Sequence, residues 1–292
     1  MTAQPATQWL PVAALVFNAF VWGVSWWPFR RLESLGLHPL WATALIYLLA
    51  VAVISAVSPR AWGQLWRTRS LWWLVLAAGA TNASFNWGVT IGDVVRVVLL
   101  FYLMPLWAVL LARLLLGERL TALAAVRVLL ALSGAAIVLW PADGGWPWPR
   151  GLPDALGLTG GFFFALNNVL LRREAHRPEM ARALAMFLGG CVVAGTLAGV
   201  LTSQGAVPLW PAASWPLAGT ALALGLIFLL GNLALQYGAA RLSANATAVV
   251  MLSEVLFASA SAVWLGAGHF SVPLAFGGAL IVGAALLAAR RA

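Results

Sequence analysis

The chain has 292 residues, of which 63% are hydrophobic and only 9% are charged. Soluble domains are typically about 45 to 50% apolar and about 25% charged, so this composition excludes an ordinary soluble protein. It predicts a protein that crosses a membrane several times, and the net charge of +9 indicates contact with anionic lipids, with no nucleic-acid partner.

Apolar stretches recur along the chain, and a stretch of about 20 residues is long enough to cross a bilayer core of about 30 Å. We expect ten of them, at residues 9–29, 40–57, 71–91, 94–116, 122–140, 155–171, 183–201, 216–237, 245–265 and 274–289. A break at Gly92 and Asp93 separates the third stretch from the fourth, because one span across both would be improbably long. The predicted fold class is an all-α membrane protein with ten transmembrane helices.

The distribution of arginine, which supplies all 17 basic residues, predicts the orientation of these helices. Cytoplasmic loops carry an excess of basic residues. If the N-terminus lies inside, 13 arginines fall on the cytoplasmic side and four on the outer side, namely Arg30, Arg31, Arg96 and Arg150. We therefore expect a multi-pass protein with both termini in the cytoplasm.

Three matches in the same order relate the first five predicted helices to the last five. They are Trp22–Ser25 before Arg30-Arg31 with Phe164–Asn167 before Arg172-Arg173, Asn86 before Gly92 with Asn232 before Gly238, and Pro105 before Leu116-Gly117 with Glu254 before Leu265-Gly266. Because five is odd, the second half must cross the membrane in the opposite direction. Inverted repeats are typical of secondary transporters, whose substrate site lies near the midplane. We predict two five-helix repeats, residues 1–145 and 146–292, around a central cavity.

The segment Tyr102-Leu103-Met104-Pro105 and the ending Leu116-Gly117-Glu118 of the same stretch resemble the drug/metabolite transporter superfamily, in its EamA-type exporter branch. The resemblance extends over nearly the whole chain and is strongest to bacterial aromatic amino acid exporters. It implies two EamA-like halves and export from the cytoplasm across the cell inner membrane. The second half departs from the pattern, because Leu265-Gly266-Ala267 replaces the Leu-Gly-Glu ending and Glu254 stands where proline is common.

Polar side chains within the predicted spans are the candidates for a substrate site, since such groups usually face the bundle interior or an aqueous cavity. Together with nearby aromatic residues, the predicted substrate-binding residues are Trp22, Asn82, Phe85, Asn86, Tyr102, Phe164, Asn168, Asn232 and Gln236. For each amide, a hydrogen bond between helices that only stabilises the bundle is the alternative.

Pro105 and Glu254 are the candidates for gating or coupling. Pro105 removes a backbone hydrogen bond and should bend the fourth helix. Glu254 lies within the apolar run AVVMLSEVLFASAS and has three interpretations that the sequence leaves open. It is a proton-coupling carboxyl, a partner for a substrate ammonium, or a protonated or hydrogen-bonded contact between helices.

Amides and aromatic rings without a fixed basic group suit a zwitterion. Together with the resemblance, which alone implies the export direction, these groups predict a secondary transporter that exports aromatic and other neutral amino acids, with broad specificity, by alternating access. The alternative is an exporter of lipophilic cations or drugs, with Glu254 as the counter-charge.

The sequence carries no nucleotide-binding loop, no HExxH pattern and a single cysteine, Cys191. We expect no cofactor, no metal site and no catalytic residue, so the protein is not predicted to be an enzyme. The expected partners are the amino acid substrate and the lipid bilayer, and the sequence allows a monomer but leaves the oligomeric state open.

Overall fold

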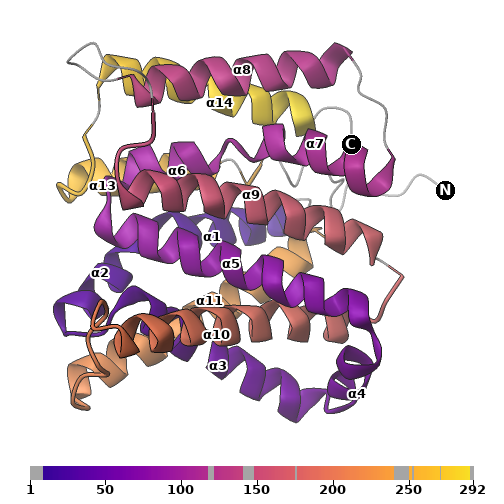
Figure 1. Cartoon of the computed structure of the whole chain (residues 1–292), viewed down its shortest axis with the longest axis vertical. Helices are drawn as coiled ribbons and strands as arrows, with labels where there is room; N and C mark the ends of the chain where they lie inside the picture. Colours follow the sequence, from indigo (N-terminus) through magenta and orange to yellow (C-terminus); the bar gives the residue numbers. More distant parts are fainter. Residues whose placement is uncertain are drawn as a thin grey trace.

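The computed structural model describes residues 9–117, 122–140, 148–174, 176–239, 250–251, 253–269 and 271–289, and the regular structure within these ranges is helical. The helices are α1 (Trp9–Val24), α2 (Trp26–Ser34), α3 (Pro39–Val57), α4 (Arg60–Arg67), α5 (Arg69–Ile91), α6 (Val94–Phe101), α7 (Met104–Leu116), α8 (Ala122–Leu139), α9 (Leu152–Arg173), α10 (Glu179–Ser203), α11 (Trp215–Ala239), α13 (Ser253–Trp264) and α14 (Val272–Ala289). Figure 1 shows most of them running across the view, stacked from α8 and α14 at the top to α3 and α4 at the bottom.

Several helices have the length and composition of membrane spans. Within the described ranges, six segments are long and apolar enough to cross a membrane: Trp9–Ser34, Pro39–Val57, Val94–Leu115, Leu152–Leu171, Glu179–Ser203 and Trp215–Leu235. Shorter apolar helices cover Val128–Val138 and Val272–Ala284. Large apolar side chains such as Leu129 and Leu256 are exposed on the outside of the bundle, where lipid tails would meet them. The chain is thus a helical membrane protein, while the number of ten crossings stays a prediction.

The predicted break between the third and fourth stretches is confirmed. Helix α5 ends at Ile91, Gly92 is extended, and the Asp93 side chain accepts a hydrogen bond from the backbone nitrogen of Arg96. A short acidic side chain at this position satisfies one of the free N–H groups that begin a helix. In the sequence, Gly92 thus marks the end of one helix and Asp93 the beginning of the next.

The first and fourth predicted stretches each form two helices, which corrects the expectation of one continuous helix in each. The first is divided at Ser25, three residues before Pro28, and the fourth at Tyr102 and Leu103, just before Pro105. Proline has no N–H to donate to the carbonyl four residues earlier. The carbonyls of Val24 and Phe101 therefore lack that partner, and each helix is interrupted near the residue concerned.

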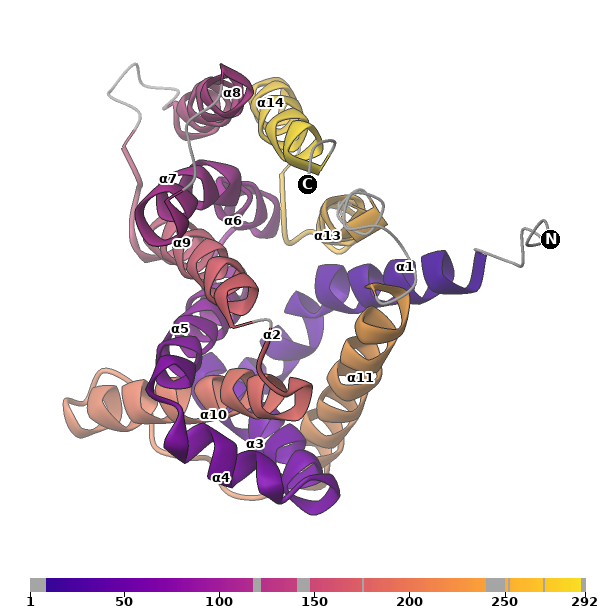
Figure 2. The ribbon, with the colours of Figure 1, turned by 90° about the vertical axis from the view of Figure 1, so that its right-hand side faces the viewer.

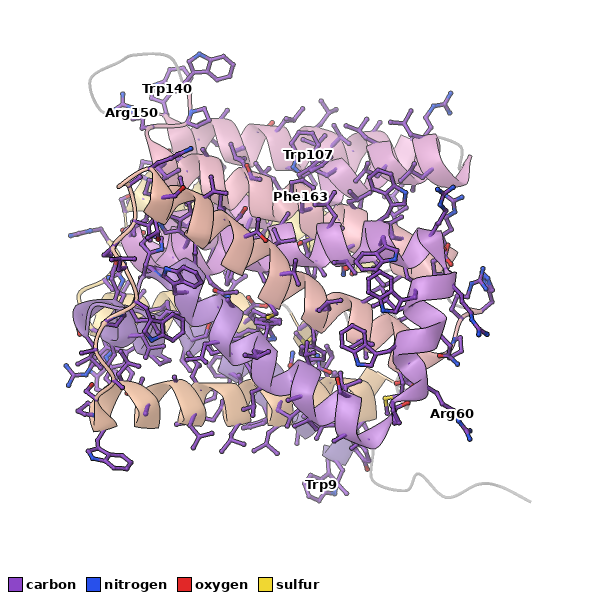
Figure 3. All side chains as sticks on the ribbon, turned by 60° about the horizontal axis from the view of Figure 1, so that its bottom comes forward. Trp9, Arg60, Trp107, Trp140, Arg150 and Phe163 are labelled. Atoms are coloured by element: carbon purple, nitrogen blue, oxygen red, sulfur yellow. The ribbon has the colours of Figure 1, made fainter. Side chains whose placement is uncertain are left out.

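The helices pack in pairs that join distant parts of the sequence. Helix α1 contacts α11 and α13, α9 contacts α5 and α7, α3 contacts α10, α6 contacts α9 and α13, and α8 contacts α14. In Figure 2, α8 and α14 lie together at the top, while α1 runs past both α11 and α13. Figure 3 places Trp140 and Arg150 at one end of the bundle and Arg60 at the opposite end.

Glycine permits the closest of these approaches. A methyl group on Gly23 of α1 would lie 2.8 Å from the carbonyl oxygen of Glu254 in α13. Likewise, a methyl group on Gly79 of α5 would lie 2.4 Å from the carbonyl oxygen of Gly189 in α10. Small residues at membrane interfaces allow backbones to approach in this way. The contact at Gly23 holds α1 directly beside Glu254.

Candidate functional site

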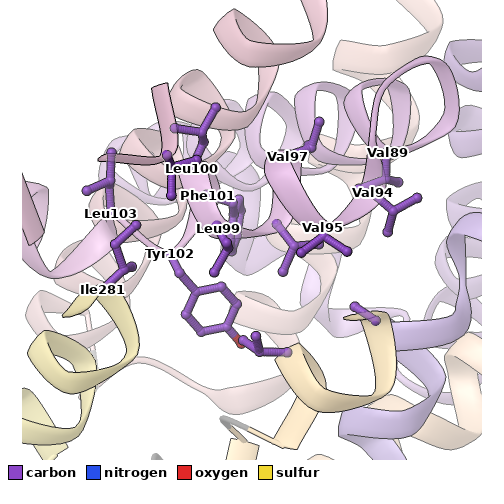
Figure 4. Packing of buried hydrophobic residues seen from close by; sticks show 14 of the residues in the cluster. Val89, Val94, Val95, Val97, Leu99, Leu100, Phe101, Tyr102, Leu103 and Ile281 are labelled. Carbon is purple, nitrogen blue, oxygen red and sulfur yellow. The ribbon is translucent and has the colours of Figure 1, made fainter. Parts of the chain in front are cut away.

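A hydrogen bond between Tyr102 and Glu254 joins α6 and α13 in the interior of the bundle. The Tyr102 hydroxyl donates to Oε2 of Glu254 at 3.1 Å. Tyr102 is buried, and Glu254 is half-buried. Figure 4 shows the Tyr102 ring extending from the packed valines and leucines of α6. The interruption before Pro105 puts Tyr102 at a helix end, and its phenol reaches the carboxyl across the interface.

Aromatic rings from five helices pack together with the Tyr102 ring and form what we call the aromatic cluster. Its members are Trp22 (α1), Phe85 (α5), Phe101 (α6), Tyr102, Phe164 (α9) and Phe228 (α11). The ring centroids are 4.7 Å apart for Phe85 and Phe101, 5.2 Å for Phe101 and Phe164, and 4.7 Å for Trp22 and Phe228. Four of the predicted site residues, Trp22, Phe85, Tyr102 and Phe164, are thus brought together by the fold.

The two predicted amides of α5 face helix α3. The Tyr47 hydroxyl donates to Oδ1 of Asn82, whose Nδ2 donates to the carbonyl of Ala78 at 2.8 Å. Asn86 is fully buried and donates from Nδ2 to Thr43 Oγ1 at 3.1 Å. These are hydrogen bonds between helices of the kind considered above as the alternative to substrate binding. The Tyr47 ring lies 6.4 Å from Phe228, which links this polar patch to the aromatic cluster.

Three buried amides keep an unpartnered oxygen within the part of the chain that the structure describes. They are Asn18 in α1, Asn86 in α5 and Asn167 in α9, each through Oδ1. Asn18 also donates from Nδ2 to the sulfur of Met251 at 3.5 Å. Buried polar atoms are normally hydrogen-bonded, so these oxygens are acceptors that a ligand or water can satisfy.

The amides predicted in the second half are placed differently from one another. Asn167 is buried, whereas its neighbour Asn168, the predicted ligand, is exposed. Asn232 is half-buried in α11, four residues beyond Phe228 and therefore on the same helical face. The side chain of Gln236 lies outside the described residues.

Sequence reasoning missed Phe101, Phe228 and Tyr47. Phe228 had a usable signal, because it lies four residues before the candidate Asn232 on one helix. Tyr47 is a lone phenol within an apolar helix, where its hydroxyl needs a partner. Phe101 had no such signal, because its role depends on the helix end that follows it.

A second bond ties α2 to α13, seven residues beyond Glu254. Trp26 Nε1 donates to Ser261 Oγ at 3.0 Å. Together with the contact at Gly23, this fixes the position of α13 against the first helices. The arrangement as a whole offers one carboxyl, several ring faces and amide oxygens, which are groups suited to an ammonium and an apolar side chain.

Comparison with known proteins finds a family similar to the first part of the chain. Residues 9–140 match the EamA-like transporter family. Comparison with curated proteins finds no match. A solved structure described only as a crystal structure of a protein is similar over 95% of this chain and 96% of its own, with a TM-score of 0.56 and 23% identity. At that identity the likeness concerns the fold alone. The matched residues, 9–140, contain Trp22, Phe85 and Tyr102, so this part of the candidate site is similar to the EamA-like transporter family.

Proposed function

We propose that the protein is a secondary transporter that exports aromatic and other neutral amino acids across the bacterial inner membrane by alternating access. The family match implies a membrane transporter of small molecules. The observation that carries the finer proposal is the hydrogen bond between Tyr102 and Glu254 beside the aromatic cluster. The export direction and the cytoplasmic position of both termini belong to the proposal and rest on the resemblance and on the arginine distribution.

The chemistry of the site favours a zwitterion with an apolar side chain. A carboxylate and aromatic faces both attract an ammonium group, and ring faces stack on an aromatic side chain. The free oxygens of Asn18, Asn86 and Asn167 add acceptors for ammonium hydrogens. A broad range of neutral amino acids fits this set, with Asn82, Asn168, Asn232 and Gln236 kept as further proposed contacts.

Phosphorylated substrates fit less well, because they need basic side chains directed into the site. The Arg30 guanidinium donates to the carbonyls of Val89 and Gly92, and Arg96 is paired with Asp154. Both arginines are therefore already occupied by partners within the fold.

Alternating access requires two halves that move relative to each other, which we assign to residues 1–145 and 146–292. The packing supports this division, since the contact of α1 with α11 and α13 corresponds to that of α9 with α5 and α7. Gly117 and Gly266, matched in the sequence, both have a left-handed backbone, with φ of 70° and 69°. Transporters with inverted repeats place their substrate between such halves.

Export of lipophilic cations or drugs is the second candidate, and Glu254 favours it. A single carboxyl among aromatic rings is a suitable site for an organic cation. The two candidates differ in what they require of Glu254, because a zwitterion brings its own carboxylate whereas a cation does not.

Counterflow into proteoliposomes tests the proposal. We expect labelled phenylalanine and threonine to exchange. Under the second candidate, Glu254→Gln should abolish exchange of a cation such as tetraphenylphosphonium, because it removes the counter-charge. Glu179→Gln is the matched control, because Glu179 is an exposed carboxylate at the start of α10. If the cation moves and both amino acids do not, the second candidate replaces the first.

A further inference from the structure

The guanidinium of Arg96 joins three helices at one end of the bundle. Its Nε and Nη2 donate to Oδ1 and Oδ2 of Asp154, both at 2.8 Å, and its Nη1 donates to the carbonyl of Val138 at 2.6 Å. Asp154 lies in the first turn of α9 and is buried. Two-pronged contact between Arg and a carboxylate is among the strongest and most directional polar contacts in proteins. The start of α6 is thus held to α8 and α9.

Asp93 attaches the same point to the connection between α13 and α14. Its Oδ1 caps α6 through the nitrogen of Arg96, and its Oδ2 accepts from the backbone nitrogen of His269 at 2.8 Å. The His269 ring nitrogen Nδ1 lies 3.5 Å from the same Oδ2. The backbone nitrogen of Val94 donates to the carbonyl of Ala267 at 3.3 Å. We call Asp93, Arg96, Asp154 and His269 the polar latch.

Arg30 secures the first-half side of the latch. Its Nη2 donates to the carbonyls of Val89 and Gly92, and its guanidinium carbon lies 5.2 Å from the centroid of the Trp26 ring. The turn between α5 and α6 is therefore bound to α2 as well. In the proposed division, α2, α5, α6 and α8 belong to the first half, and α9 and the α13–α14 connection belong to the second.

The latch lies between an open pocket and a closely packed interior. A pocket of about 570 Å³ is lined by Asp93, Arg96, His269 and the apolar residues Ile137, Val138, Trp140, Pro273 and Leu274, with Ser271. Between Asp93 and Arg96 in the sequence, Val95 packs so closely on Gly268 that a methyl group there would lie 2.9 Å from its side chain. One turn further along α6, a methyl group on Gly278 would lie 3.1 Å from Leu99. Val95 and Leu99 are both buried. The latch and this buried packing therefore lie together at the edge of the pocket.

We propose that the polar latch is a gate of the transport cycle, which holds the two halves together at this end and must separate for substrate to pass. This inference rests on the proposed alternating access. Separation exposes Asp154 and Arg96 to water, which can replace the hydrogen bonds that each loses. Asp154 also accepts from the backbone nitrogen of Arg150 at 2.8 Å, and Arg96 also donates to the carbonyl of Val138. Removing one partner therefore leaves these contacts but takes away the charged, two-pronged one, so a single neutral substitution weakens the closed state and favours the open one.

Thiol labelling tests whether the latch controls access, and it needs no substrate. In a Cys191→Ser background, which removes the single cysteine of the chain, Val95→Cys places a thiol in the buried contact with Gly268 beside the latch. In nanodiscs, we expect slow modification by a charged thiosulfonate when the latch is intact. The labelling rate follows the fraction of protein in the open state. If that fraction is about 1 to 10% in the intact protein, adding Arg96→Gln or Asp154→Asn can raise the labelling rate about tenfold or more.

The matched control is Glu174→Gln. Glu174 is a buried carboxylate directly after the other end of α9, paired with Arg177 at 3.4 Å. Glu174→Gln should leave the labelling rate of the Val95→Cys thiol unchanged, because Glu174 lies at the end of α9 opposite the latch. An unchanged rate in both Arg96→Gln and Asp154→Asn, in protein that remains folded by size-exclusion chromatography, would overturn the proposal.

A cross-link tests whether the gate must open during transport while leaving the four latch residues in place. Val94→Cys with Ala267→Cys, in the same cysteine-free background, places one thiol in each of two segments that already share a backbone hydrogen bond. Linking them with a short bis-thiosulfonate should stop transport, and reduction should restore it. Equal transport by the linked and reduced forms overturns the gate. If no substrate moves in either form, the proposed function fails, and the labelling result still decides the latch.

Discussion

The hydroxyl of Tyr102 and the carboxyl of Glu254 meet at 3.1 Å, although 152 positions separate them in the chain. One residue stands at the interruption between α6 and α7, and the other lies in α13. The bond joins the two proposed halves at the aromatic cluster. Movement of α13 away from the end of α6 would break this hydrogen bond.

Tyr102→Phe should lower transport while leaving the fold intact. It removes one hydrogen bond to a carboxyl, and bonds to charged groups contribute about 1.5 to 3 kcal/mol, which corresponds to a tenfold to hundredfold effect on rate if the bond acts in the cycle. Proteoliposome counterflow measures this. Trp73→Phe, at an exposed ring of α5, is the control and should behave like the unaltered protein. Equal rates for the two variants would show that the bond has no part in transport.

Gly23→Val should separate α1 from α13. The new Cβ would lie 2.8 Å from the Glu254 carbonyl oxygen and from Cβ of Phe257. Overpacking of this kind costs about 1 to 3 kcal/mol. Thermal unfolding should show a clear loss of stability, whereas Gly199→Ala, where a methyl group meets nothing within 4 Å, should not. A stable Gly23→Val protein would mean that α1 and α13 do not need this close contact.

Thr43→Val and Asn86→Leu separate a structural role of the amide from a binding role. Thr43→Val removes only the hydroxyl that Asn86 contacts, so stability should fall by about 0.6 to 2 kcal/mol with an unchanged KM. Asn86→Leu also removes the free Oδ1, and we expect a higher KM for phenylalanine as well. If both variants change stability alone, Asn86 is a purely structural contact.

Phe228→Leu should weaken recognition of aromatic substrates more than that of threonine. Loss of an aromatic pair costs about 0.5 to 1.5 kcal/mol, so the KM for phenylalanine should rise about threefold to tenfold. Phe276→Leu, at an exposed ring of α14, serves as the comparison. An equal change in KM for both amino acids would argue that Phe228 only packs.

His38 should make stability depend on pH. It precedes α3 and accepts a hydrogen bond through Nδ1 from the nitrogen of Leu40 at 3.3 Å, and burial lowers its pKa below the ordinary value of 6.5. A lowered pKa means that the folded protein favours the neutral ring. This contribution is therefore complete above pH 6.5 and is lost as the pH falls through the folded pKa. The unfolding temperature should drop between pH 7.5 and 5.5, and His38→Asn, which retains a capping side chain, should remove most of that drop.

The helices could be predicted from the sequence because their signals are local. Length and apolar composition located helices where the structure describes the predicted stretches, while the start of the ninth, at residue 245, lies outside the described residues. Gly92 followed by Asp93 marked a helix boundary by itself. The interruptions at Ser25 and Tyr102 could not be placed in the same way. A proline indicates a bend, and the neighbouring helices decide whether the chain bends or breaks.

The rotation of each helix explains most of what the sequence could not predict about the site. Asn167 and Asn168 are adjacent, yet neighbouring residues point about 100° apart around a helix, and the buried one was not the predicted one. Asn82 and Asn86 were correctly placed on one face of α5, but nothing local indicated that Tyr47 and Thr43 lie opposite them. The same holds for Arg96 and Asp154, which pair across 58 positions.

The interruption at Tyr102 also divides mechanical roles along one membrane crossing. Helix α6 is anchored by the polar latch and by its packing on α9 and α13, whereas α7 packs on α8 and α9. A continuous helix would transmit any tilt from one membrane face to the other. Two short segments joined at Tyr102 can pivot separately, so the phenol can leave the carboxyl while the latched end stays still. In the proposed alternating access, the interruption at Tyr102 and Leu103 would let the end at the latch and the end at α7 open at different times.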